Sequence, residues 1–162
     1  LLRRWLPDDD LLIGYPDELD HPGLASQVLR GFLTGSIDSV LRVGSDRDPR
    51  YLVVDYKTNR LGGQPELLLE HYRPEAMAQE MIRSHYPLQA LVYCVALHRF
   101  LSRRLPGYRP EQHLGGVGYL FVRGMGGPDS PVVGGHPLGV FSWRPPAALV
   151  DGVSTLLAGG RS

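Results

Sequence analysis

The stretch GSIDSVLRVGSDRDPRYLVVDYK, residues 35–57, decides the fold of this chain. β-Branched, aliphatic and aromatic residues lie on both sides of the cluster GSDRDPR, whose Gly, Asp, Ser and Pro are typical of a turn. We therefore expect a β-hairpin in which residues 36–43 pair with residues 51–57. The sequence from Gln27 onwards also favours strand structure, either as two short strands or as one strand bent near Gly35.

Two carboxylates and one ammonium group stand at special positions in this hairpin. Side chains alternate across a strand, so Asp55 and Lys57 point to the same face, about 7 Å apart along the chain. Asp38 comes from the neighbouring strand, so the two carboxylates can share one divalent cation with the ammonium beside it. Mg²⁺ suits this arrangement, because it binds few carboxylates and completes its octahedron with water and phosphate oxygens.

This pattern predicts metal-dependent chemistry on a phosphate group, and the alternative is an ion pair without a metal. A bound cation would polarise a phosphate, and Lys57 would orient the attacking water or stabilise the charge that builds up on phosphorus. An Asp-x-Lys tripeptide alone is a weak signal, and an exposed ion pair on an edge strand explains the tripeptide more readily than a metal site does. The apolar run before Asp55 favours the metal site, because an unpaired carboxylate next to it would be costly.

The rest of the chain alternates between helical and strand patterns, which indicates a mixed α/β fold with helices packed on a central sheet of four or five strands. We expect a loop at 58–74, a helix from Glu75, a second helix from Pro87 to about Leu105, a strand at Gly115–Val122, a loop at 124–138, a strand at Val140–Trp143 and a helix at Pro145–Leu157.

Length and composition indicate one globular domain. The chain has 162 residues and a formal net charge of zero, so composition alone does not suggest a nucleic-acid partner. Residues 1–26, with several prolines, are interpreted as an irregular connecting segment, and residues 27–162 as the domain. The first residue is not methionine, and we expect a piece of a longer protein.

Cysteine content and hydropathy indicate the cellular compartment in which the protein is expected. Cys94 is the one cysteine and lies in an apolar run, so we expect a buried, inert thiol and a reducing, cytoplasmic environment. No apolar run is long enough to span a bilayer, and no membrane partner is expected.

Four segments together resemble the nuclease domain of RecB, the β subunit of exonuclease V, within the PD-(D/E)XK nuclease superfamily. They are GSIDSVLR, YLVVDYKTNRLG, YPLQALVYCVALHRFLSRRL and HLGGVGYLFVRGM. The resemblance covers about residues 31–123 and is weaker to about residue 145. It rests on an Ile-Asp, an Asp-Tyr-Lys and a following Gln-x-x-x-Tyr, and it implies a restriction-endonuclease-like core.

The resemblance also implies roles for individual residues. Asp38 and Asp55 would bind Mg²⁺, or Mn²⁺ or Ca²⁺ in the same site, with the backbone carbonyl of Tyr56 as a further contact. Lys57 would be the catalytic lysine. Gln89 and Tyr93 match Gln-x-x-x-Tyr and share a helix face, so they would support the site or DNA, although plain helix packing also explains them. Independently of the resemblance, Arg123 stands at the end of the expected strand at Gly115–Val122, where a contact with phosphate and a surface ion pair are equally good interpretations.

The family pattern includes one more metal ligand, a His or Glu on a helix well upstream of the first aspartate. No convincing helix of this kind precedes Asp38, and His21 is a weak candidate because Pro22 follows it.

The resemblance implies an Mg²⁺-dependent exonuclease that cuts DNA during double-strand-break repair and recombination. Its partners would be RecC- and RecD-like subunits and the helicase portion of the same polypeptide. The alternative is a non-catalytic, nuclease-like module that binds DNA or partner subunits.

Overall fold

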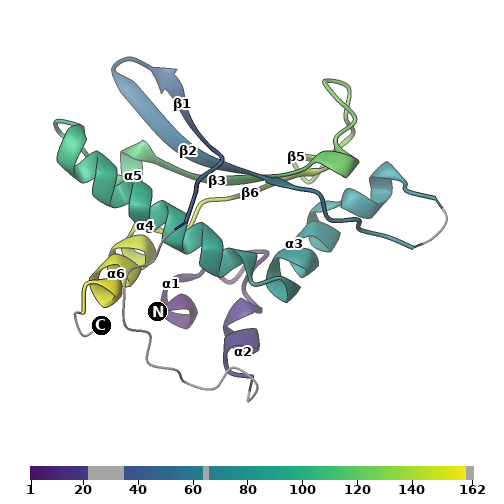
Figure 1. Cartoon of the computed structure of the whole chain (residues 1–162), viewed down its shortest axis with the longest axis horizontal. Coiled ribbons are helices and arrows are strands. Elements are labelled where there is room, and N and C mark those ends of the chain that lie inside the picture. Colours follow the sequence, from purple (N-terminus) through teal and green to yellow (C-terminus); the bar gives the residue numbers. More distant parts are fainter. Residues whose placement is uncertain (22–34, 64–65, 160–162) are drawn as a thin grey trace.

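A mixed four-stranded sheet forms the centre of the protein in this computed structural model, which describes residues 1–21, 35–63 and 66–159. The strand order is β1-β2-β3-β6, with β1 and β2 antiparallel, β2 and β3 parallel, and β3 and β6 antiparallel. The strands are β1 (Ser39–Ser45), β2 (Asp48–Lys57), β3 (Leu114–Phe121) and β6 (Val140–Trp143). The predicted α/β class with a mixed sheet is confirmed (Figure 1).

The predicted hairpin is confirmed, with a tighter turn than expected. Ser39 pairs with Val54 and Ser45 with Asp48, so the pairing continues into the cluster at 44–50 that was predicted to be all turn. Gly44 allows this close approach: its φ is +88°, and an added Cβ would lie 2.6 Å from the Asp48 carbonyl oxygen. The strand expected over residues 27–34 lies outside the described residues.

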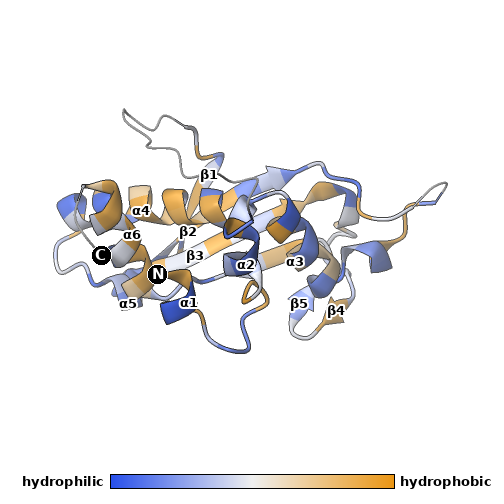
Figure 2. Ribbon diagram, turned by 90° about the horizontal axis from the view of Figure 1, so that it is seen from below, coloured by the Kyte–Doolittle hydropathy of each residue, from blue (hydrophilic) through white to orange (hydrophobic). Residues whose placement is uncertain are grey.

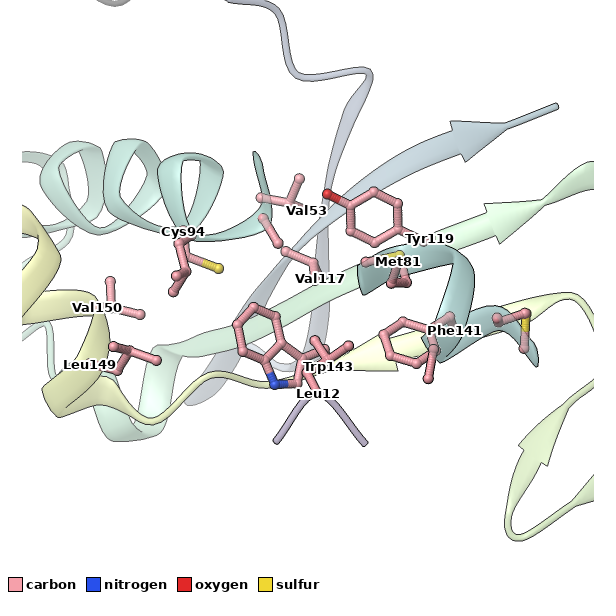
Figure 3. Close-up of a cluster of buried hydrophobic side chains, with 14 of the residues drawn as sticks. Leu12, Val53, Met81, Cys94, Val117, Tyr119, Phe141, Trp143, Leu149 and Val150 are labelled. Atoms are coloured by element: carbon pink, nitrogen blue, oxygen red, sulfur yellow. The ribbon is translucent and has the colours of Figure 1, made fainter. Parts of the chain in front are cut away.

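The helices lie on one side of the sheet and cover a shared apolar core (Figure 1). Helix α3 (Pro74–Arg83) and helix α4 (Tyr86–Arg104) both carry proline in their first turn, where the missing N–H costs nothing. Helix α6 (Ala147–Leu157) packs against α4. Figure 2 shows that α4 is largely hydrophobic along its length, and the close-up in Figure 3 shows core side chains from these helices meeting those of the sheet. The predicted helices and the last strand are confirmed within a few residues.

The N-terminal residues are part of this core, and the interpretation of residues 1–26 as an irregular surface connection is wrong for residues 1–21. They form the short helices α1 (Leu2–Trp5) and α2 (Tyr15–Leu19). Leu12 and Tyr15 are fully buried, and the Trp143 indole N–H donates to Asp10 Oδ2 at 3.0 Å. The boundary at residue 26 lies outside the described residues.

Replacing Leu12 with alanine tests this correction. Because Leu12 is 0% exposed, we expect the free energy of unfolding to fall by about 2–5 kcal/mol, the range for a truncated core leucine. Leu11→Ala is the matched control, since Leu11 is 42% exposed and a surface change of this kind stays within about 0.5 kcal/mol. Urea denaturation of both variants measures the difference. If both variants lost the same small amount of unfolding free energy, residues 1–21 would be a connecting segment and not part of the core.

Short regular structure forms in the two segments predicted as loops, and also just before β3. The 58–74 segment holds a 3-10 helix η1 (Leu69–Tyr72), and helix α5 (Pro110–His113) precedes β3. The glycine-rich 124–138 segment holds a small hairpin of β4 (Val132–Val133) and β5 (His136–Pro137), after a 3-10 turn η2 (Val122–Gly124). These elements are too short to leave a hydrophobic period in the sequence. In the described ranges no helix is both long enough and apolar enough to cross a membrane.

Candidate active site

A buried ion pair stands at the carboxyl end of β2. Lys57 Nζ lies 2.7 Å from Asp55 Oδ2. The residues are 9% and 5% exposed, so both charges are almost fully removed from water. The strand register places Asp55 beside Tyr119 of β3 on the same face. The prediction that Asp55 and Lys57 share a face is confirmed, and the alternative of a solvent-exposed pair is wrong.

Asp38 lies next to this pair, although not on a strand as predicted. It sits in a bend one residue before β1, which begins at Ser39 opposite Val54. Its Oδ2 accepts a hydrogen bond from the backbone N–H of Tyr56 at 3.1 Å. The hairpin therefore brings Asp38 to the chain segment between Asp55 and Lys57, which is where a shared cation would need it.

The Gln-x-x-x-Tyr motif on α4 faces the same place. Gln89 Oε1 accepts a hydrogen bond from Lys57 Nζ at 3.0 Å, and Gln89 Nε2 donates to the hydroxyl of Tyr93 at 3.0 Å. The Tyr93 hydroxyl donates in turn to the carbonyl oxygen of Ser36 at 2.8 Å. The two side chains thus link α4 to the chain just before Asp38, and plain helix packing does not describe them.

The ionisation of Tyr93 reflects both carboxylates. Partial burial raises the pKa of Tyr93, and the negative charges of Asp55 and Asp38 raise the same pKa further. The phenol therefore stays protonated and keeps its role as a hydrogen-bond donor to Ser36. Both carboxylates thus act electrostatically on one phenol.

Arg123 contacts the chain that follows β2. It lies in η2, and its Nε donates to the carbonyl oxygen of Thr58 at 2.9 Å. The side chain contacts backbone next to Lys57, and it is exposed. The contact with phosphate stays a prediction.

A second polar network behind the site was not predicted. Asn59 donates to Glu80 Oε1 at 2.7 Å and accepts from the Tyr86 hydroxyl at 3.2 Å. The Tyr72 hydroxyl donates to the carbonyl of Asn59 at 3.0 Å. Glu80 is 5% exposed, and this carboxylate in an otherwise apolar helix face was the signal that could have revealed the network.

The donor set around Asp38 fits a hard cation that keeps several waters. Asp38, Asp55 and the Tyr56 carbonyl supply only oxygen atoms, the donor type that Mg²⁺ prefers. In residues 1–21, 35–63 and 66–159 no three His, Cys, Asp or Glu side chains are grouped so that they could hold a metal together. His21 is exposed and is not part of such a group. A cation here would depend on two carboxylates, with water and phosphate as its remaining ligands.

The remaining reactive side chains have structural roles. Cys94 is 2% exposed, and burial raises the pKa of its thiol to about 12, so the predicted inert thiol is confirmed. His98 Nδ1 lies 3.0 Å from the Tyr108 hydroxyl, and His113 bonds the backbone of Arg109. Neither histidine touches the ion pair.

Comparison with known proteins finds relatives among the RecB subunits of the RecBCD enzyme. The chain is 55% identical over 158 residues to the RecBCD enzyme subunit RecB of Mycolicibacterium smegmatis, which covers 97% of this chain and 14% of that protein. It is 41% identical over 139 residues to RecB of Haemophilus influenzae, a match that covers 83% of this chain and 10% of that protein. It is 39% identical over 153 residues to RecB of Escherichia coli, a match that covers 93% of this chain and 12% of that protein. No protein-family model matches the sequence.

Proposed function

Because this chain belongs to the RecB family, we propose that it is an Mg²⁺-dependent DNA nuclease domain of the PD-(D/E)XK type. The chain spans 14% of the length of the Mycolicibacterium smegmatis RecB that it matches. One observation carries the proposal: the buried ion pair of Asp55 and Lys57, with Asp38 beside it. The desolvation penalty of a buried ion pair can exceed its Coulombic gain, so stability alone is a weak reason for such a pair and a functional role is favoured. A preorganised ammonium beside a cation site would stabilise the charge that develops during phosphodiester hydrolysis.

The residues divide the work of the reaction between them. Asp38, Asp55 and the carbonyl of Tyr56 would hold the cation, which when bound supplies Lewis-acid polarisation of the scissile phosphate. Lys57 orients the attacking water or stabilises the charge that builds on the phosphate oxygens. Gln89 accepts a hydrogen bond from the ammonium that Asp55 also contacts, so the lysine is in position before substrate arrives.

The biological setting follows from the relatives. Their name assigns them to RecBCD, so we propose that this segment works in a complex with RecC- and RecD-like subunits, beside the helicase portion of its own polypeptide. In that setting it would degrade DNA as an exonuclease during double-strand-break repair and recombination. The neutral net charge supports this view, because such a domain would rely on the complex to deliver DNA.

Asp55→Ala separates the nuclease from the rival, a non-catalytic module that binds DNA or partner subunits. In a nuclease this variant loses Mg²⁺-dependent cleavage of linear DNA, while its affinity for DNA, measured by fluorescence anisotropy, stays the same or rises as a negative charge is removed. Asp46→Ala is the matched control, since Asp46 is an exposed carboxylate on the hairpin turn. A wild-type protein that binds DNA as tightly as Asp55→Ala and cuts none of it would support the rival.

A further inference from the structure

Lys57 is the one lysine in a chain with seventeen lysine and arginine residues. Two tyrosine rings surround its ammonium group. Nζ lies 3.8 Å from the ring centre of Tyr86 on α4 and 5.0 Å from that of Tyr119 on β3. The two rings are stacked, with centroids 5.8 Å apart and planes at 15°. Electron-rich ring faces attract a cation, and the attraction grows when water is excluded.

Three groups of the protein contact the ammonium group of Lys57, a residue that is 9% exposed. It has three N–H groups, and its neighbours are Asp55 Oδ2 at 2.7 Å, Gln89 Oε1 at 3.0 Å and the face of Tyr86. A compact ammonium fits such a space, whereas a planar guanidinium with five donors does not. The enclosure thus accounts for a lysine at this position in a chain that otherwise uses arginine.

The hydroxyl of Tyr119 fixes the orientation of the amide that completes the enclosure. Tyr119 is 0% exposed, and its hydroxyl lies 3.1 Å from Gln89 Oε1 and 3.2 Å from the Tyr86 carbonyl oxygen. Both neighbours are carbonyl-type oxygens that only accept, so the Tyr119 hydroxyl is the donor. Gln89 Oε1 therefore points toward Lys57 and Tyr119, and its amide NH₂ toward Tyr93.

We propose that Tyr86 and Tyr119 are positioning residues that enclose the ammonium group of Lys57 and hold it against Asp55. Both residues contribute their rings to the enclosure, and Tyr119 also contributes its hydroxyl to the orientation of Gln89. As far as the reaction is concerned, this inference rests on the proposed nuclease function. The enclosure itself is a property of the folded chain and is measurable without substrate.

Chemical modification of the lysine tests the enclosure directly. Because Lys57 is the one lysine, an amine-reactive ester labels a single side chain, which peptide mass spectrometry follows in the absence of DNA and metal. We expect labelling of Tyr86→Leu to be about tenfold faster than wild type, since the cation loses its ring. Tyr86→Phe keeps the ring and the slow rate. Tyr119→Phe releases Gln89 and falls between the two.

Matched variants and a second measurement decide the result. Tyr108→Phe removes a hydroxyl that bonds His98, away from Lys57, and must label at the wild-type rate. In cleavage assays Tyr86→Leu lowers kcat and leaves KM unchanged. Equal labelling rates for wild type and Tyr86→Leu, both folded by circular dichroism, would overturn the enclosure. Altered labelling with no cleavage even by wild type would refute the nuclease function and leave the enclosure standing.

Discussion

Replacing Lys57 with alanine lowers the rate of Mg²⁺-dependent DNA cleavage by about 10²–10³-fold, the usual loss when one preorganised charge-stabilising donor is removed. The effect is expected in kcat, because the ammonium acts on charge that develops during the reaction. Single-turnover cleavage of a labelled linear DNA measures it. Lys57→Arg is not expected to restore the rate, since a planar guanidinium does not reproduce the contacts of a compact ammonium with Asp55, Gln89 and Tyr86.

Arg50→Ala is the control for this experiment. Arg50 is an exposed cation on the same strand as Lys57, at the far end of β2. Its removal changes the general attraction of DNA and leaves kcat unaltered. A Lys57→Ala variant that cleaves at the wild-type rate, or a loss of the same size in both variants, would remove Lys57 from the catalytic machinery.

Breaking the buried ion pair from one side destabilises the protein by about 3–5 kcal/mol. Asp55→Ala leaves the ammonium of Lys57 in the core without its carboxylate, and Lys57→Met leaves the carboxylate without its ammonium. The double variant removes both charges, so we expect it to be more stable than either single variant. Urea denaturation of the four proteins gives the coupling free energy as a double-mutant cycle.

The pair of Arg42 and Asp46 provides the comparison for the cycle. It also spans a short contact, 2.7 Å, but its side chains are 45% and 93% exposed. Exposed pairs contribute at most about 1 kcal/mol, so the coupling there is small. If the two cycles returned equal coupling, the ion pair of Asp55 and Lys57 would be open to water and not held in the core.

Much of the hairpin and its charges could be predicted from sequence because the information is local. Alternation along β2 places Asp55 and Lys57 on one face whatever packs against it. The turn chemistry between the strands fixes which residues pair, and so brings Asp38 to Tyr56. The four-residue spacing of Gln89 and Tyr93 likewise fixes that they share a helix face.

The parts that could not be predicted depend on contacts between distant segments. Asp10 gains its role from Trp143 and Glu80 from Asn59, and no local pattern marks either pair. Nothing in the local sequence distinguishes Tyr119 from an ordinary strand residue. Its place beside Asp55 depends on the parallel pairing of β3 with β2. The short N-terminal helices lack a sustained period and take their structure from the core that they cover.

Cleavage of linear single-stranded DNA by the purified protein, with Mg²⁺ or with EDTA, tests the central claim most directly. The account predicts cleavage that requires Mg²⁺ and disappears in Lys57→Ala. It would be contradicted by a folded protein that leaves the DNA intact at every Mg²⁺ concentration, or by cleavage that continues unchanged in EDTA.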